Sequence, residues 1–171
     1  MKVLIFGNLA SGKTTLALKL TRKLSQFQYL AIDNFRRDYG DGSMEKEKQA
    51  KEMFFQSIKE NKNQIIEAMG FGDGGAFLAE TLGPLSEPKL IVLLKTPLNV
   101  CLKRLEQRKW DVPYPAPKEK AFSLARITHE LISDDILAFL WESALNTQRI
   151  DFENTDNNSI KKIINRINHL S

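Results

Sequence analysis

The sequence predicts an α/β fold in which helices cover both faces of a parallel sheet. Short apolar segments alternate with longer amphipathic ones, and the apolar segments are hydrophobic throughout rather than at every second residue. Strands with this pattern are buried on both faces, which is typical of parallel sheets. The length of 171 residues fits one domain, and we expect residues 1–171 to form it.

Five segments have the composition of buried strands, being short, apolar and often β-branched. The clearest of them lies between two prolines, Pro88 and Pro97. In chain order the predicted strands are Lys2–Phe6, Tyr29–Asp33, Ala76–Glu80, Lys89–Lys95 and Arg149–Phe152.

Helical spacing of apolar residues predicts the elements between these strands. A first helix begins near Thr14, and a long charged helix carries Phe54, Ile58, Ile65 and Met69 on one face. The segment GFGDGG (70–75) ends that helix; because it follows a helix and precedes a strand, we interpret it as a loop. Later helices are predicted at about Pro97–Lys109, at Glu119–Leu145 with a break near Ser133, and around Ile160–Ile167.

Composition and charge narrow the classes of function. The net charge of +4 suits an anionic partner, either nucleotide phosphate or nucleic acid. A single cysteine excludes an intrachain disulfide and indicates a reducing, cytoplasmic location. No apolar run approaches the ~18 residues that a membrane span needs, so we expect no membrane association. Two histidines and one cysteine leave no cluster with zinc spacing.

The first predicted strand runs into a complete phosphate-binding loop. The segment from Gly7 to Thr14 matches G-x-x-x-x-G-K-[ST], the Walker A pattern, between a strand and an amphipathic helix. Its glycines let backbone N–H groups surround a phosphate, Lys13 reaches the β- and γ-phosphates, and the Thr14 hydroxyl binds Mg²⁺. The predicted nucleotide-binding residues are Gly7, Asn8, Leu9, Ala10, Ser11, Gly12, Lys13, Thr14 and Thr15.

Several classes of nucleotide-binding protein lack support in the sequence. GTPases need D-x-x-G and N-K-x-D, and neither motif occurs here. The L-S-G-G-Q signature of transporter ATPases is also missing, and ring ATPases usually need a longer chain for their helical lid domain. These exclusions favour a compact protein that transfers phosphate to a small molecule.

With these motifs the chain resembles the small P-loop kinases, the group that includes adenylate, shikimate, gluconate and uridine kinases. The resemblance spans nearly the whole length, although only the opening loop is highly specific. It implies a five-stranded parallel sheet in the order 2-3-1-4-5 and the cofactors ATP and Mg²⁺. It also implies a substrate-binding helical segment at about 34–70 and an arginine-bearing lid at about 104–120.

Asp33 lies at the end of the second predicted strand, where open α/β sheets place their ligands. Relatives of uridine kinase carry a similar Asp-x-Phe-Tyr whose aspartate takes the proton of the substrate hydroxyl. This chain matches at Asp33 and Phe35 but has Arg36 in place of the tyrosine. We therefore predict that Asp33 is a catalytic base and that Arg36 and Arg37 bind an anionic acceptor. The alternatives are a turn or helix-cap aspartate and two solvated arginines.

Three further residues complete the predicted site. Glu80, after four apolar residues, has the pattern of a Walker B acid that holds Mg²⁺ through water; the alternative is an ordinary carboxylate at a strand end. Arg104 and Arg108 are four positions apart and share a helix face. In the resembling family, arginines here neutralise charge on the transferred group. The alternative is a solvated basic helix face.

The leading hypothesis is therefore an ATP- and Mg²⁺-dependent kinase that moves the γ-phosphate onto a small hydroxyl or phosphate acceptor. Nucleosides, nucleotides and small hydroxylated metabolites all fit as that acceptor. The rivals are a nucleotide-dependent protein that binds or processes nucleic acid, and an NTP hydrolase without an acceptor. The sequence leaves the acceptor, the preferred nucleotide and the oligomeric state open.

Overall fold

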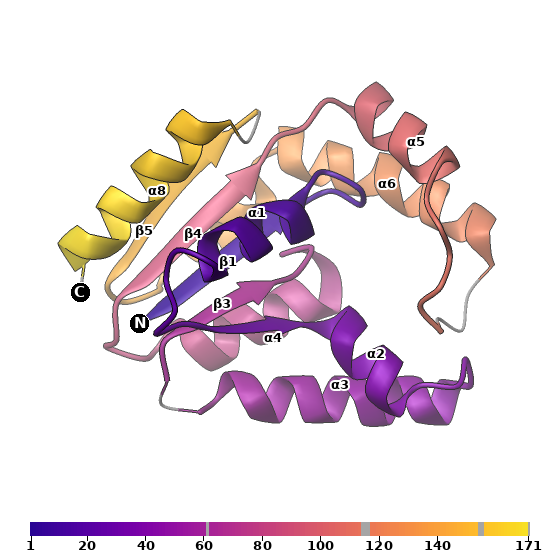
Figure 1. The fold of residues 1–171 in the computed structure, drawn as a ribbon, viewed down its shortest axis with the longest axis horizontal. Coiled ribbons are helices and arrows are strands. Elements are labelled where there is room, and N and C mark those ends of the chain that lie inside the picture. Colours follow the sequence, from indigo (N-terminus) through magenta and orange to yellow (C-terminus); the bar gives the residue numbers. More distant parts are fainter. Residues whose placement is uncertain (61, 114–116, 154–155, 171) are drawn as a thin grey trace.

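The computed structural model describes residues 1–60, 62–113, 117–153 and 156–170 and contains one five-stranded sheet (Figure 1). All four strand pairs are parallel, and the spatial order is β2-β3-β1-β4-β5. The predicted fold class and strand order are thereby confirmed. The strands are β1 (Lys2–Gly7), β2 (Gln28–Ala31), β3 (Gln64–Glu67), β4 (Lys89–Leu94) and β5 (Thr147–Phe152).

Helices cover both faces of the sheet, so the fold has three layers with the sheet in the middle (Figure 1). Helices α1 and α8 pack on one face, and α3, α4, α7 and the end of α6 pack on the other. Their bounds are α1 (Lys13–Thr21), α2 (Ile32–Tyr39), α3 (Met44–Ile58), α4 (Gly72–Leu82), α5 (Leu98–Glu106), α6 (Lys118–Ser133), α7 (Ile136–Leu140) and α8 (Asn157–Leu170). Among the described residues, no helix is both long enough and apolar enough to span a bilayer.

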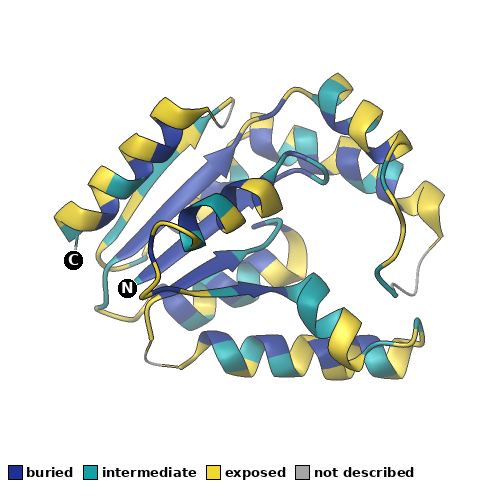
Figure 2. Ribbon diagram, in the orientation of Figure 1, coloured by how far each residue is buried: buried dark blue, intermediate teal, exposed yellow. Residues whose placement is uncertain are grey.

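The central strand, β1, shows why a strand covered on both faces needs apolar residues at every position. Val3 and Ile5 belong to the core under α1 and α8, whereas Leu4 and Phe6 belong to the core on the opposite face. All four side chains are fully buried (Figure 2). Because burying each such side chain is worth about 1.5–3 kcal/mol, β1 anchors both layers at once. It also fixes the start of the phosphate-binding loop that follows it.

The third strand is not where the sequence pattern predicts it. The prediction of a strand at Ala76–Glu80 is wrong, because these residues lie in α4, where Gly75, Leu78 and Leu82 are buried at helical spacing. The third strand is instead β3, whose Ile65 and Ile66 are buried on opposite faces. The predicted long helix therefore ends at Ile58, and neither Ile65 nor Met69 belongs to it.

The glycine-rich segment at 70–75 consequently follows a strand and runs into a helix, which is the reverse of the predicted order. The prediction of a loop is wrong for residues 72–75, which form the first turn of α4. Gly70 has a φ of 84°, and a Cβ there would lie 2.5 Å from the Phe6 ring. A Cβ on Gly75 would lie 2.3 Å from the carbonyl oxygen of Gly70. These two glycines therefore let the chain turn tightly and bring the start of α4 against the end of β1.

The remaining elements differ from the predictions mainly at their ends. Strand β2 ends at Ala31, so Asp33 lies in the first turn of α2 rather than in a strand. Residues 134–135 separate α6 from α7, which confirms the break predicted near Ser133. Residues 114–116, in the middle of the predicted lid, lie outside the described residues.

Candidate active site

The opening loop lies beyond the carboxyl end of β1, where parallel sheets place their ligands. Gly7 and Gly12 have φ angles of 149° and 100°, which residues with a side chain rarely adopt. A Cβ on Gly7 would also lie 2.8 Å from the carbonyl oxygen of Leu94 on β4. The two glycines of the motif are thus required by the backbone itself, and they direct the loop into the first turn of α1.

Lys13 is buried inside this loop. Its ammonium donates hydrogen bonds to the carbonyl oxygens of Asn8 at 2.7 Å and Gly7 at 3.2 Å. Burial lowers the pKa of Lys13, and the nearby carboxylate of Glu67 opposes that shift. The buried Lys13 ammonium has two carbonyl partners but little contact with water, so a nearby anion would stabilise it further. Lys13 is therefore placed to bind a phosphate.

Three side-chain hydrogen bonds tie the loop to other parts of the chain. The amide of Asn8 donates to the carbonyl oxygen of Ala125 on α6 at 2.8 Å. Thr96 Oγ1 donates to the carbonyl oxygen of Ser11 at 3.0 Å, and Arg104 donates to that of Ala10 at 3.2 Å. Since unliganded loops otherwise fluctuate, these contacts preorganise the backbone for its ligand.

The loop also contains a buried polar atom that a ligand can satisfy. Ser11 is 4% exposed, and its Oγ has no hydrogen-bond partner among the described residues. Leaving such a group unpaired costs roughly 1–3 kcal/mol. A phosphate oxygen in the loop would remove that cost, which supports the assignment of residues 7–14 as a phosphate site.

The carboxylate beside Thr14 belongs to Glu67, at the end of β3. Thr14 Oγ1 donates to Glu67 Oε1 at 2.7 Å, and the Tyr29 hydroxyl donates to Glu67 Oε2 at 2.5 Å. Burial and the Glu67 carboxylate together raise the pKa of Tyr29. Glu80, by contrast, is exposed on α4 and does not line the cleft, so its prediction as the metal-binding acid loses its structural basis.

These oxygens suit Mg²⁺ rather than a softer metal. The described residues contain no group of three or more His, Cys, Asp or Glu side chains that could hold a metal ion. Thr14 and Glu67 would hold Mg²⁺ with the help of water and nucleotide phosphates, which is how this ion is usually bound in phosphoryl-transfer enzymes. The donor set therefore fits the metal that the loop motif implies.

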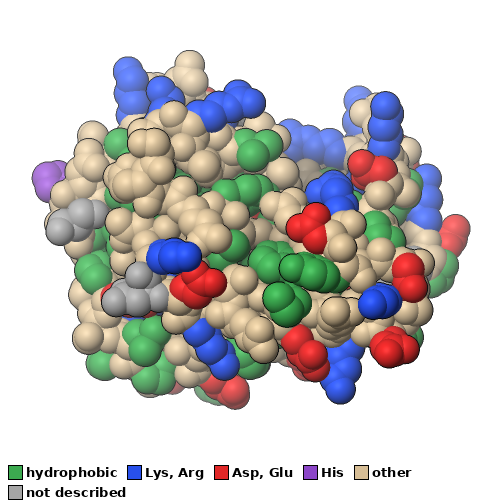
Figure 3. Space-filling view, turned by 60° about the horizontal axis from the view of Figure 1, so that its bottom comes forward, with side chains coloured by type: hydrophobic (Ala, Val, Ile, Leu, Met, Phe, Trp, Pro, Cys, Tyr) green, Lys and Arg blue, Asp and Glu red, His purple; other side chains and the backbone are tan. Residues whose placement is uncertain are grey.

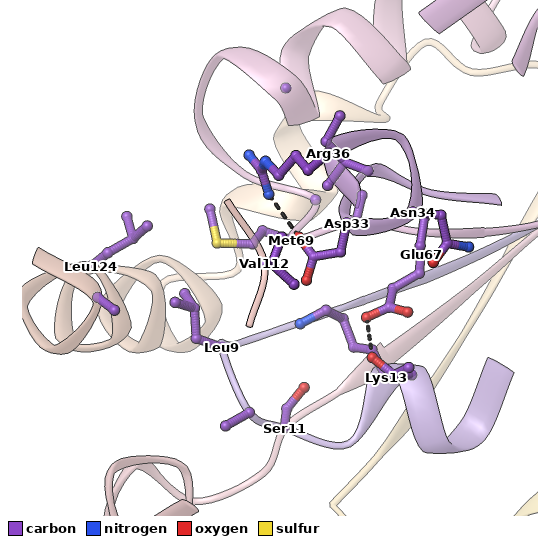
Figure 4. Close-up of a pocket in the computed structure, with 18 of the residues that line it drawn as sticks. Leu9, Ser11, Lys13, Asp33, Asn34, Arg36, Glu67, Met69, Val112 and Leu124 are labelled. Carbon is purple, nitrogen blue, oxygen red and sulfur yellow. Dashed lines mark hydrogen bonds and ion pairs between the residues drawn. The ribbon is translucent and has the colours of Figure 1, made fainter. Parts of the chain in front are cut away.

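Asp33 faces the phosphate-binding loop from α2 and contacts two arginines. Its Oδ1 accepts from Arg36 Nη1 at 2.8 Å, and its Oδ2 accepts from Arg108 Nη2 at 3.2 Å. Figure 4 shows the Asp33 carboxylate and the Lys13 ammonium projecting into the same cavity. The predicted base and the predicted phosphate-binding lysine are thus brought together, although they come from different elements.

The other two nitrogens of the Arg36 guanidinium engage Glu47, an acid that sequence reasoning missed. Nε and Nη2 of Arg36 donate to the two oxygens of Glu47 at 2.8 and 2.7 Å. Glu47 is 4% exposed and lies on α3, so these two hydrogen bonds join α3 to α2. The next arginine, Arg37, is exposed and donates to Asn34 at 3.4 Å.

All of these groups surround one cleft of about 920 Å³. Of the predicted site residues, the cleft is lined by Leu9 to Thr15, Asp33, Arg36, Arg37, Arg104 and Arg108. Gly7 and Asn8 belong to the loop but do not line the cleft, and neither does the exposed Glu80. Lys and Arg outnumber Asp and Glu along the wall, which favours an anionic ligand. Figure 3 shows such basic side chains on both sides of a hollow in the surface.

Comparison with known proteins identifies the fold. No protein-family model matches the chain, and no curated protein matches it either. Solved structures do match over nearly the whole chain. Shikimate kinase from Bacteroides thetaiotaomicron is 17% identical with a TM-score of 0.58, covering 99% of this chain and 97% of that one. Deoxyadenosine kinase from M. mycoides with bound dATP is 15% identical with a TM-score of 0.57, covering 98% and 100%.

A third similar structure is Kti12 from Chaetomium thermophilum in complex with ADP-AlF3. It is 15% identical, has a TM-score of 0.60, and the match covers 99% of this chain and 98% of that one. At such identities the likeness establishes the fold and leaves the substrate open. The chain has the fold of the P-loop small-molecule kinases, with the phosphate-binding loop of that fold intact.

Proposed function

We propose that the protein is an ATP- and Mg²⁺-dependent kinase that transfers the γ-phosphate to a hydroxyl group of a small molecule. The observation that carries this proposal is the position of Asp33. A carboxylate lies across one cleft from a complete phosphate-binding loop, on a wall that is otherwise rich in cations. A nucleotide hydrolase needs the loop and the metal, but it has no evident need for a second carboxylate that faces them from α2.

The nucleotide side of the site consists of residues 7–15. The loop N–H groups and Lys13 bind the phosphates, as the two carbonyl contacts of the ammonium support. Thr14 and Glu67 would hold Mg²⁺, which would supply positive charge to balance that of the nucleotide phosphates. Glu67 here takes the role that the sequence pattern assigned to Glu80.

Asp33 acts as the general base. The acceptor hydroxyl oxygen attacks the γ-phosphorus, the hydroxyl proton passes to the Asp33 carboxylate, and ADP leaves with the electrons of the broken phosphorus–oxygen bond. Proton removal by a positioned carboxylate is worth ~10²–10⁴-fold in rate. Arg104 and Arg108 neutralise the charge that spreads over the transferred group.

The acceptor is bound by α2 and α3, which are the helical part of the predicted substrate-binding segment at about 34–70. The segment at about 104–120 closes over it as a lid. Phe54 and Phe55 of α3 line the same cleft as Asp33 and provide apolar contact for the acceptor. Arg37 and Lys51 line the same region and suit an anionic group on it. Arg36, engaged by Glu47 and Asp33, orients the base instead of binding the acceptor directly.

The test is phosphate transfer from γ-labelled ATP to a pool of nucleosides, nucleotides and hydroxylated metabolites. Lys13→Ala should give no labelled product, whereas Lys23→Ala, which changes an exposed lysine outside the cleft, should match the wild type. Release of labelled inorganic phosphate alone would identify an NTP hydrolase. Salt-sensitive binding of a polynucleotide, without any labelled product, would favour the nucleic-acid rival.

A further inference from the structure

Tyr29 and Glu67 lie on neighbouring parallel strands and on the same face of the sheet. Tyr29 is opposite Ile65 in the register of β2 and β3, and Glu67 is opposite Ala31. The two residues are therefore diagonal neighbours, a separation that a long aromatic side chain can bridge. The hydroxyl of Tyr29 does so, since it lies 2.5 Å from Glu67 Oε2.

The contact leaves both oxygens of the Glu67 carboxylate with a defined partner. Oε1 accepts from Thr14, on the loop side, and Oε2 accepts from Tyr29, on the strand side. A glutamate has one more rotatable bond than an aspartate and loses correspondingly more freedom when it is fixed. Two hydrogen bonds from opposite sides hold its carboxylate in one orientation beside Thr14.

The ring of Tyr29 has a separate role from its hydroxyl. It packs against the core formed by β1, β3 and α1, which includes Val3 and Ile65. Phenylalanine in its place would keep this packing and remove only the donor to Glu67. The chain thus offers a substitution that separates packing from positioning.

We propose that Tyr29 is a positioning residue that acts through Glu67 to fix the Mg²⁺ site of the nucleotide. This inference rests on the proposed function, because it requires that Thr14 and Glu67 hold the metal. Groups that orient a metal ligand through a hydrogen bond typically change metal affinity by about 10–100-fold when removed. Loss of the Tyr29 hydroxyl should therefore weaken metal binding while the affinity for metal-free nucleotide stays close to that of the wild type.

The experiment measures Mn²⁺ binding by electron paramagnetic resonance in the presence of a non-hydrolysable ATP analogue. Tyr29→Phe should raise the apparent Kd for Mn²⁺ by about 10-fold or more. The control is Tyr39→Phe, because Tyr39 stacks on Phe35 and does not line the cleft. It should leave the Kd unchanged. Thermal unfolding of both variants checks that the fold is intact.

A double-mutant cycle with Glu67→Gln separates positioning from a general structural effect. If Tyr29 acts through Glu67, Tyr29→Phe should have little further effect on Mn²⁺ affinity in the Glu67→Gln background. Additive losses would overturn the inference, as would unchanged Mn²⁺ affinity in Tyr29→Phe.

The readout needs no acceptor, so it separates this inference from the proposed kinase activity. Normal metal binding by the wild type, with the expected loss in Tyr29→Phe, would support the role of Tyr29 even if no labelled acceptor were found. That result would count against the kinase proposal alone. A wild-type protein that bound no Mn²⁺ with the nucleotide analogue would overturn the inference.

Discussion

Arg108 and Asp33 form an ion pair across the cleft, with Nη2 of Arg108 lying 3.2 Å from Oδ2 of Asp33 although the residues are 75 positions apart. Arg108 follows α5, in the predicted lid, whereas Asp33 belongs to α2. Each side chain is 35% exposed, so water weakens the pair and a ligand can compete with it. Without nucleotide, the proposed base is therefore paired with an arginine that a phosphate can attract away.

Replacing Arg108 should lower the rate of phosphate transfer more than it lowers the affinity for ATP. The guanidinium stabilises charge that develops mainly in the transition state, and removing one such donor typically costs about 10²–10³-fold in kcat. Steady-state kinetics of Arg108→Ala, with ATP affinity measured by calorimetry, checks this. Equal losses in kcat and in ATP affinity would mark Arg108 as an ordinary phosphate anchor.

Arg104 should behave differently if its contact in the structure persists with nucleotide bound. Because it donates to the carbonyl oxygen of Ala10 in the phosphate-binding loop, Arg104→Ala should weaken ATP binding as well as catalysis. The double variant lacking both arginines should lose the most activity. If neither single variant changed rate or affinity, both residues would be ordinary solvated arginines, one on α5 and one just after it.

Asp33→Asn should abolish most acceptor phosphorylation and leave ATP binding intact. Asparagine keeps the shape of the side chain but has no basicity, so the rate should fall by ~10²–10⁴-fold. The measurement pairs calorimetry of ATP binding with quantification of the phosphorylated product. Unchanged product formation would remove Asp33 from the chemistry.

Glu67→Gln should raise the Mg²⁺ concentration that gives half-maximal activity, whereas Glu80→Gln should not. Glu67 contacts the Thr14 hydroxyl, and Glu80 is exposed on α4 outside the cleft. The two substitutions are chemically identical and differ only in position, which makes each a control for the other. Metal titrations at saturating ATP decide between them, and a larger effect at Glu80 would restore the original assignment.

Lys13→Met should stabilise the nucleotide-free protein while removing its response to ATP. Burial lowers the pKa of Lys13 in the folded state below the ordinary lysine value of 10.5. Between that lowered value and 10.5 the unfolded chain binds more protons than the folded one, so the free energy of unfolding rises with pH. Below this window the wild type carries the full cost of a buried charge, and there the advantage of Lys13→Met should be largest.

Chemical denaturation from neutral pH to about pH 10 tests the direction of this pH dependence. The difference in free energy of unfolding between the two proteins should shrink as the pH approaches 10.5. In parallel, ATP should raise the Tm of the wild type and leave that of Lys13→Met nearly unchanged. An advantage of Lys13→Met that grew with pH would contradict the stated effect of burial on Lys13.

The sequence was sufficient for the loop and for the sheet order, because the loop motif is specific and the resemblance implies the order of the strands. It failed at Glu67 for a physical reason. Ile65 lies seven positions after Ile58, and Met69 four positions after Ile65, so their spacing imitates the stripe of a continuing helix. A strand of four residues that is buried on both faces has no periodicity of its own to oppose that pattern.

One partner of Arg36, Glu47, was also beyond the sequence pattern. Arg36 and Glu47 are eleven positions apart, and only the turn between α2 and α3 brings them together. Within a single helix such a pair would not meet, because direct contacts along a helix join residues three or four apart. The α2–α3 turn therefore brings Glu47 to Arg36, an arginine predicted to bind the acceptor, whose other partner Asp33 lies three positions earlier in the same helix.

The position of β1 between β3 and β4 constrains how the protein can be made. The phosphate-binding loop follows β1 directly, yet both strands that flank β1 are synthesised after it, at a ribosomal rate of about 5–20 residues per second. Until β4 emerges, an edge of β1 and its apolar side chains lack their native cover, and Gly7 lacks the Leu94 carbonyl that packs against it. Nucleotide binding by the nascent chain should thus begin late, after the central three strands have assembled, and ATP cannot guide the earlier steps of folding.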